Sequence, residues 1–407
     1  MSFKIIHTAD WHIGRKFHDL DLGEHHSLFF DWLLAYIKEN TIDLLLVSGD
    51  IFDLANPSQE SLKLYYKFLS QLSHTNCKAI ITAGNHDSPG LIDAPAGLLN
   101  ALDMQVIGVP PADKEKLIFP VYSKEEKCIA AVAAVPFLRD RDVKKAVEGE
   151  TYDSRIDAVR EGMANFYKET KEVMMEKYPG LLHIAMGHLF TAFAVPSDTE
   201  RDVQIGNQAL FPVAGFEGLF DYTALGHIHK AQTIGKSSTI RYSGSPIPMS
   251  FSEKDYHHQV VLLEIERDII MQHEISVPRS FQLSSFKGSL GEIQKEISKL
   301  TAEENIPHYF DVTVLEDNYS STVFTETDEL VKQIQQNSKR RVLQTRIIFK
   351  NNSENSVSPE LITSADDLSP EFIYSEMISK REENEKEELM NLFYEVKQTV
   401  ENGHENS

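Results

Sequence analysis

Five short segments of this 407-residue chain carry side chains of the kinds that bind metal ions. They are Asp10-Trp11-His12, Gly49-Asp50, Gly84-Asn85-His86-Asp87, Gly187-His188 and Gly226-His227-Ile228-His229. Carboxylate, amide oxygen and imidazole together suit a divalent transition metal with mixed oxygen and nitrogen ligands. The candidate ligands are too many for one ion and about right for two: Asp10, His12, Asp50, Asn85, His188, His227 and His229. Two ions that share a bridging carboxylate, roughly 3.5–4 Å apart, clamp the attacking and leaving oxygens of a phosphate ester.

Each of these segments follows a short apolar run with the length and composition of a buried β-strand. The runs span residues 3–7, 42–47, 79–82, 181–186 and 222–225. In an open α/β sheet the carboxyl ends of such strands share one edge, where ligands bind. Most of the candidate ligands also follow a glycine, which lets the backbone turn sharply. We therefore expect side chains up to about 220 positions apart in sequence to meet at one place.

Taken together, the five segments resemble the signature of the calcineurin-like metallophosphoesterase family. A single Asp-x-His or His-x-His pair is common by chance, whereas all five segments in this order form a specific pattern. Three further segments are similar to the SbcD family of nuclease subunits, which belong to bacterial SbcC–SbcD complexes. These segments span residues 8–14, 197–202 and 241–251. The likeness extends along nearly the whole chain and is best over residues 1–265.

The resemblance implies a role for each candidate ligand. Asp10, His12 and His229 would hold one ion. Asn85, His188 and His227 would hold the other, and Asp50 would bridge both. The expected ions are two Mn²⁺, with Mg²⁺ second because it prefers shells of oxygen ligands.

The resemblance also implies two catalytic residues, His86 and Asp87. His86 would stabilise the transition state or donate a proton to the leaving oxygen, and Asp87 would orient His86 or its loop. The role of Asp53 stays open, and a supporting position behind the ligands is one interpretation. Of the remaining histidines, only His7 and His183 lie inside predicted strands, where they could support the ligands.

The composition limits what the chain can do alone. A formal net charge of −22 has the wrong sign for a protein that holds DNA by its own electrostatics. Residues 351–407 carry −10 of that charge, but the first 350 residues still carry −12. Strong DNA binding is therefore expected to depend on a partner. Two cysteines give no disulfide framework, and no apolar run approaches ~20 residues, so we expect a cytoplasmic protein without a membrane segment.

Strands alternate with helical patterns over most of the chain, which indicates an α/β fold. Helices are predicted at 27–38, 58–73 and 156–178, and further strands at 129–135 and 259–266. The family resemblance makes the expected fold a metallophosphoesterase β-sandwich flanked by helices. The predicted organisation is a nuclease domain (1–270), a small α+β capping domain (271–350), a linker (351–368) and amphipathic helices (369–400).

The predicted C-terminal helices carry apolar residues on one face, including Phe372, Met377, Leu392 and Phe393. They could fold back on the protein's own core or dock on a partner helix. The resemblance favours docking, because SbcD-like proteins hold the coiled-coil root of SbcC with this region.

Three functions compete at this point. The first is a DNA exonuclease and endonuclease, acting on duplex ends and on single-stranded or hairpin DNA. It would work in repair, recombination and replication with an SbcC-like ATPase, as a homodimer within a heterotetramer. The alternatives are a stand-alone phosphoesterase for nucleotides or small phosphodiesters, and a non-enzymatic scaffold. His86 argues against the scaffold, and the extra domain and tail argue against the small-molecule enzyme.

Overall fold

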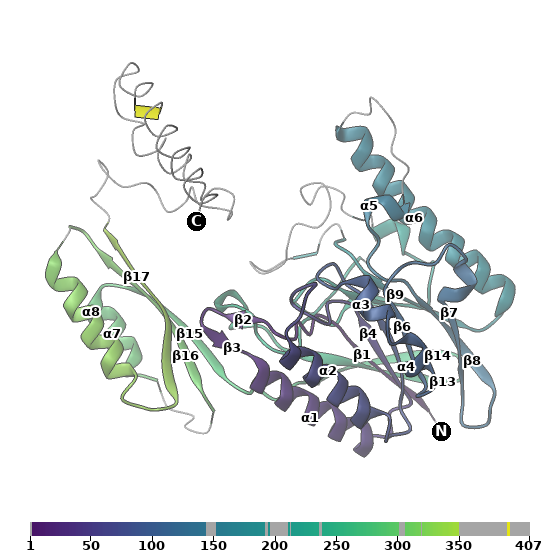
Figure 1. The fold of residues 1–407 in the computed structure, drawn as a ribbon, viewed down its shortest axis with the longest axis horizontal. Helices are drawn as coiled ribbons and strands as arrows, with labels where there is room; N and C mark the ends of the chain where they lie inside the picture. Colours follow the sequence, from purple (N-terminus) through teal and green to yellow (C-terminus); the bar gives the residue numbers. More distant parts are fainter. Residues whose placement is uncertain are drawn as a thin grey trace, which may run out of the picture. The chain divides into compact units, whose positions relative to one another are not determined.

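The computed structural model describes residues 2–143, 152–191, 194–195, 211, 213–235, 238–300, 306–318, 320–349 and 389–390. Apolar runs form two six-stranded sheets, which lie on one another in the larger part of the molecule (Figure 1). The first sheet has the order β14-β13-β1-β4-β5-β6. Its strands are β1 (Phe3–Thr8), β4 (Leu44–Ser48), β5 (Lys78–Thr82), β6 (Met104–Ile107), β13 (Gln259–Glu266) and β14 (Ile269–Ser276).

The second sheet has the order β11-β12-β10-β9-β8-β7. Its strands are β7 (Ile118–Tyr122), β8 (Cys128–Ala134), β9 (Leu182–His188), β10 (Tyr222–Gly226), β11 (Gln232–Thr233) and β12 (Ile240–Tyr242). Strands β1, β4, β5 and β6 run parallel in the first sheet, as do β8, β9, β10 and β12 in the second. Each sheet thus brings several strand carboxyl ends to one edge.

A dry layer of apolar side chains separates the two sheets. It includes Ile5 and Leu46 from the first sheet and Ile184 and Ala224 from the second. These strands are buried on both faces, which explains why their sequences are continuous apolar runs rather than alternating ones. His7 lies in the same layer, where its Nδ1 is 2.9 Å from the Tyr222 hydroxyl and its Nε2 is 3.2 Å from the Leu225 carbonyl oxygen.

Helices cover the outer faces of the sandwich. Helices α1 (Gly23–Glu39) and α2 (Gln59–Leu72) pack on the first sheet, and α6 (Tyr152–Lys177) packs on the second (Figure 1). The Ser58 hydroxyl caps α2 by accepting the Ser61 amide at 3.1 Å. The shorter elements are β2 (Lys16–Phe17), β3 (Leu20–Asp21), α3 (Pro89–Asp93), α4 (Ala96–Asn100), η1 (Lys114–Leu117), α5 (Asp140–Val143), η3 (Val213–Gly215) and η4 (Phe251–Glu253).

The predicted β-sandwich with flanking helices is confirmed, but the expectation of a single sheet edge is wrong. Strands β1, β4 and β5 belong to one sheet and β9 and β10 to the other. The predicted last strand, β13, is also followed by β14 in the same sheet. As an edge strand, β14 is mostly exposed and shows no apolar run that would have revealed it.

After the strands of the sandwich, the chain forms a three-stranded sheet of order β15-β16-β17. It comprises β15 (Gln282–Gly288), β16 (His308–Glu316) and β17 (Arg340–Phe349), with helices α7 (Leu290–Ile297) and α8 (Ser321–Ile334). This region has the expected α+β character. The chain divides into two compact units, one formed by Met1–Phe286, Glu296–Val312 and Leu330–Thr345, and the other by the remaining residues.

The predicted domain boundaries, and the capping role of residues 271–350, stay predictions. The segment 197–202, the linker and the C-terminal helices fall outside the described residues, apart from Leu389 and Met390. Among the helices that the structure describes, none has the length and apolar character needed to cross a membrane.

Candidate metal centre

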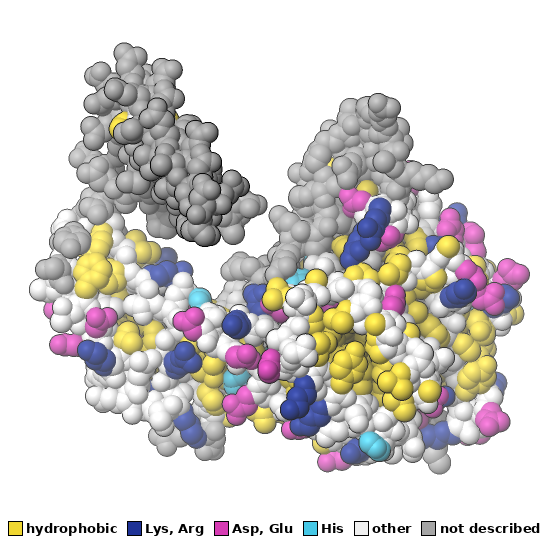
Figure 2. All heavy atoms as spheres, in the orientation of Figure 1, with side chains coloured by type: hydrophobic (Ala, Val, Ile, Leu, Met, Phe, Trp, Pro, Cys, Tyr) yellow, Lys and Arg dark blue, Asp and Glu magenta, His cyan; other side chains and the backbone are white. Residues whose placement is uncertain are grey.

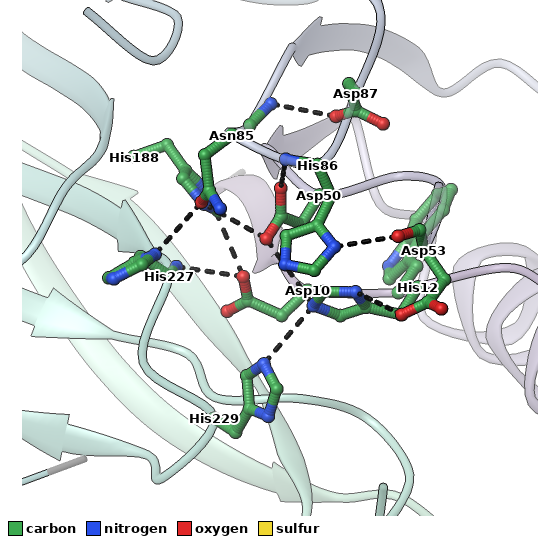
Figure 3. A network of polar contacts seen from close by, with 12 residues as sticks. Asp10, His12, Asp50, Asp53, Asn85, His86, Asp87, His188, His227 and His229 are labelled. Carbon is green, nitrogen blue, oxygen red and sulfur yellow. Dashed lines mark hydrogen bonds and ion pairs between the residues drawn. The ribbon is translucent and has the colours of Figure 1, made fainter. Parts of the chain in front are cut away.

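The five chemically suggestive segments meet where the carboxyl ends of β1, β4, β5, β9 and β10 come together (Figure 3). Backbone bonds join the first two segments, since the Asp10 amide donates to Gly49 O at 3.1 Å and the His12 amide to Asp50 O at 3.0 Å. Two side chains of these segments bind the third and the fifth segment. The His86 amide donates to Asp50 Oδ1 at 2.9 Å, and the His227 amide donates to Asp10 Oδ1 at 2.8 Å.

The Asp10-Trp11-His12 segment is anchored by its middle residue. Trp11 is fully buried, and its ring lies 5.0 Å from that of Phe30 and 5.3 Å from that of Phe68, between α1 and α2. Its Nε1 donates to Thr8 Oγ1 at 3.1 Å. Because Trp11 occupies the core, the residues on either side of it, Asp10 and His12, are fixed at the edge of the sheet.

The backbone at the centre is strained. Four of the candidate ligands have a positive backbone angle φ, which residues other than glycine rarely adopt. They are Asp10 (54°), His12 (45°), Asp50 (51°) and His227 (101°). Such strain gathers at functional sites, where the surrounding structure holds it in place. The hydrogen bonds between the loops supply that restraint here.

The glycines of these segments allow the loops to approach one another closely. A Cβ added to Gly49 would lie 2.2 Å from His188 Nδ1, and one added to Gly226 would lie 2.0 Å from Ser48 O. Only Gly49 of these two has a positive φ, at 84°. From the sequence, sharp turns were the expected reason for these glycines, and the structure adds close packing as a second requirement.

Most of the candidate ligands lie in two neighbouring sets. Ligand atoms of Asp10, His12 and His229 lie within 4.8 Å of one another, as do those of Asp50, His188 and His227. Asn85 belongs with the second set. Its Oδ1 is 2.9 Å from His188 Nε2 and 3.1 Å from His227 Nδ1.

Asp50 lies between the two sets. Its Oδ2 is 3.5 Å from His12 Nε2 and 3.3 Å from His188 Nε2. A carboxylate in this place can reach an ion in either set, which is the position expected of a bridging ligand.

His86 was predicted to be catalytic rather than a ligand, yet its side chain lies among the candidate ligands. Its ring lies 4.6 Å from that of His12, and it forms a third cluster of potential ligands with His12 and Asp50. Its Nδ1 is 2.7 Å from the Asp53 carbonyl oxygen, to which an N–H at this atom would donate. This bond leaves Nε2 as the nitrogen available for other chemistry.

Asp87 binds backbone amides rather than the His86 ring. Its oxygens accept from the amides of Ile51 (3.1 Å), Phe52 (2.9 Å) and Gly84 (2.8 Å). Burial raises the pKa of Asp87 to about 6, against the effect of these amides. Of the two predicted roles, these contacts favour orientation of the loop, because Asp87 joins the second segment to the third.

Carboxylates support two of the histidines from behind. His12 Nδ1 is 3.3 Å from Asp53 Oδ1, which also lies 3.1 Å from the Arg15 guanidinium. His229 Nδ1 is 3.1 Å from Glu253 Oε1. The sequence left the role of Asp53 open and gave no sign of Glu253, because a single Glu 24 residues after His229 stands out by neither type nor spacing.

The two other histidines considered as supports have different surroundings. His183 lies near the amino end of β9, where it is 2.7 Å from Lys171 Nζ and 2.9 Å from the Tyr178 carbonyl oxygen. The hypothesis that His183 supports the ligands is therefore wrong. His7 belongs to the first sheet and contacts Tyr222 and Leu225 of the second. Leu225 directly precedes the Gly226 segment.

Burial makes the centre electrostatically incomplete without cations. Asp10 Oδ2 and His227 Nε2 are buried and have no hydrogen-bond partner among the residues that the structure describes. Burial raises the pKa of Asp10 to about 7 and lowers that of His12 to about 4. Burial alone would lower the pKa of His188, but attraction to the Asp50 carboxylate outweighs burial and raises this pKa to about 9. This donor set fits two divalent metal ions, which would neutralise the carboxylates and use the His227 ring nitrogen.

Comparison with known proteins agrees with this site. The calcineurin-like phosphoesterase pattern matches residues 3–231, which contain all the candidate ligands. The SbcD component of nuclease SbcCD from Escherichia coli (strain K12) is 28% identical over 414 residues, covering 99% of this chain and 100% of that protein. The corresponding SbcD protein of Rhodobacter capsulatus is 32% identical over 284 residues, covering 68% of this chain and 69% of that protein. The chain therefore belongs to the calcineurin-like phosphoesterase family, in which it is a metal-dependent nuclease subunit of the SbcD type.

Proposed function

We propose that this chain hydrolyses DNA phosphodiester bonds with two divalent metal ions, of which Mn²⁺ is the first choice. Asp10, His12 and His229 would hold one ion, Asn85, His188 and His227 would hold the other, and Asp50 would reach both. The proposal rests above all on Asp50 Oδ2, which lies within 3.5 Å of a ring nitrogen from each set. Mixed carboxylate and imidazole ligands favour Mn²⁺ over Mg²⁺.

Two such ions stabilise charge on the phosphate and lower the pKa of the attacking water. The chain's own residues position the ligands and donate the proton. The inter-loop hydrogen bonds keep both ligand sets in place before substrate binds, so no reorganisation is needed during the reaction. His86 keeps a proton on Nδ1 through its bond to Asp53 O, and Nε2 of the protonated ring donates to the leaving sugar oxygen.

The proposed substrates are duplex ends, single strands and hairpins of DNA, with an SbcC-like ATPase as partner. The names of the relatives describe one subunit of a complex, SbcCD. The net charge of −22 supports a division of labour, because a chain with this charge gains little affinity for DNA from its own electrostatics. We assign the contact with the ATPase to the predicted amphipathic helices at 369–400, of which only Leu389 and Met390 lie within the described residues.

We also propose that two copies associate within the complex. Figure 2 shows hydrophobic side chains gathered on one face, over the part where Figure 1 places α3 and α4. Leu98, on α4, is 69% exposed, and Leu102 just beyond it is 41% exposed. Large exposed apolar surface is typical of protein–protein contacts.

One assay separates this function from its alternatives. The purified chain with Mn²⁺ is given hairpin DNA, duplex DNA and a bis-aryl phosphodiester, with and without the ATPase. We expect Mn²⁺-dependent cleavage of single-stranded regions by the chain alone, and ATP-stimulated degradation of duplex ends with the partner. Cleavage of the small diester alone would instead support a stand-alone phosphoesterase. Inactivity on every substrate, with both ions bound, would support a scaffold.

A further inference from the structure

A fully buried carboxylate lies directly behind one of the candidate ligands. Glu253 ends η4 and has no exposed surface, and its Oε1 is 3.1 Å from Nδ1 of the buried His229. Its other oxygen, Oε2, accepts the Met249 amide at 3.0 Å. Burying a carboxylate is unfavourable unless hydrogen bonds compensate for the lost water. Both Glu253 oxygens are thus committed to hydrogen-bond acceptance.

A second carboxylate lies behind His12, on the other side of this ligand set, although His12 Nδ1 has no hydrogen-bond partner among the described residues. His12 Nδ1 faces Asp53 Oδ1 at 3.3 Å, and its Nε2 faces inward. The Glu253 carboxylate, which is within hydrogen-bond distance of His229 Nδ1, keeps the ring proton of His229 on that atom, so the lone pair of this imidazole lies on Nε2. The Nε2 atoms of His12 and His229 lie 3.2 Å apart. Two lone pairs at this distance would repel, so either the His12 ring carries its proton on Nε2 and donates to His229 Nε2, as we expect in the metal-free protein, or a cation accepts both lone pairs.

We propose that Glu253 is a positioning residue of the metal centre. Its Oε1 accepts the Nδ1–H of His229 and so directs His229 Nε2 toward the ion shared with Asp10 and His12. This inference rests on the proposed two-metal function and adds a residue to it. Carboxylates behind metal-bound histidines orient the ring and strengthen the ligand, and their loss typically lowers metal affinity 10–100-fold.

Glu253→Gln tests the orientation of the ring proton. The Met249 amide can only donate, so the single oxygen of Gln must face it, and the Gln amide NH₂ then faces His229 Nδ1. The ring proton is thereby moved to Nε2, the atom needed for the ion. In ¹⁵N-histidine NMR of the metal-free protein, we expect His229 to carry its proton on Nδ1 in the wild type and on Nε2 in the variant. An unchanged pattern would overturn the inference.

Calorimetric titration with Mn²⁺ provides the second measurement. We expect Glu253→Gln to lower the affinity of one of two sites by about 10–100-fold and to leave the other within a few-fold. Glu253→Asp keeps both acceptor oxygens and should restore part of the affinity together with the Nδ1 proton. Two sites of wild-type affinity in Glu253→Gln would overturn the role of Glu253 alone. Failure of the wild type to bind two ions would overturn the proposed function as well.

Asp93→Asn is the matched control. Asp93 accepts two backbone amides, Gly108 at 2.5 Å and Val109 at 3.0 Å, and is the last residue of α3. Its neutralisation should change Mn²⁺ binding at neither site. If Asp93→Asn weakened one site as much as Glu253→Gln does, the effect of Glu253 would be a general loss of stability, and the inference would be wrong.

Discussion

The Nε2 atoms of His12 and His229 lie 3.2 Å apart, although 217 residues separate the two histidines in sequence. His12 follows a strand of the first sheet and His229 a strand of the second. The proposed site of the first ion therefore exists only when both sheets are formed and packed. Metal binding and folding of the sandwich should consequently be coupled.

Removal of the metal ions should lower thermal stability. The buried carboxylates of Asp10 and Asp50 lie close to each other, and cations in the native state would compensate their charge. Ligand present at 100 times its Kd stabilises the native state by about 2.7 kcal/mol. Thermal unfolding after dialysis against a chelator should occur several degrees lower and recover with Mn²⁺. An identical melting temperature with and without Mn²⁺ would contradict a site within the folded core.

Asp50→Asn should disrupt both halves of the centre. The substitution removes the negative charge that lies between the two ligand sets while keeping the side-chain shape. We expect metal analysis after dialysis to show well under two ions per chain, with loss of nuclease activity. Glu264→Gln, which neutralises a carboxylate of β13 that pairs with Lys4 at 3.7 Å, is the control. Retention of both ions and full activity in Asp50→Asn would refute the bridging role.

His86→Ala should separate chemistry from metal binding. If His86 donates a proton to the leaving oxygen, turnover falls by about 10²–10⁴-fold while both ions remain bound. The measurement pairs metal analysis with cleavage rates at saturating Mn²⁺. Loss of an ion would instead make His86 a ligand, together with its neighbours His12 and Asp50.

Gly49→Ala should damage the centre through packing alone. The added methyl group would lie 2.2 Å from His188 Nδ1 and 2.9 Å from the Gly84 Cα, at a backbone φ of 84°. We expect a loss of stability of at least ~1 kcal/mol and weaker Mn²⁺ binding. Gly97→Ala, in α4 with open space around it, is the control and should stabilise the protein by about 0.4–1 kcal/mol. Equal effects of the two changes would show that the close packing at Gly49 is unimportant.

Deletion of all residues after Lys350 should separate the nuclease from its partner. The proposed ligands all precede residue 230, so the truncated chain should keep its metals and weak cleavage of single-stranded DNA. It should lose co-purification with the ATPase and ATP-stimulated degradation of duplex ends. Leu392→Asp should act in the same way, because burying an unpaired carboxylate at an interface costs several kcal/mol. Full binding by the truncated chain would place the contact elsewhere, and its unfolding would make the tail part of the core.

The sequence predicted the candidate ligands and the kind of fold. Each of the five segments follows a largely buried strand, and a continuous apolar run followed by Asp, Asn or His is visible without a structure. The main helices were predictable for a similar reason. Their apolar residues recur at helical spacing because one face packs on a sheet.

Only the tertiary structure decided how these parts combine. Apolar runs show that strands are buried but not which strands pair, so one sheet edge was expected where two sheets meet. The edge strand β14 escaped prediction because edge strands bury few side chains. Glu253, and the way in which the predicted residue Asp87 acts, were hidden for a related reason. Asp87 acts through backbone amides and Glu253 through a histidine 24 positions away, and neither partner can be identified until the loops are folded against each other.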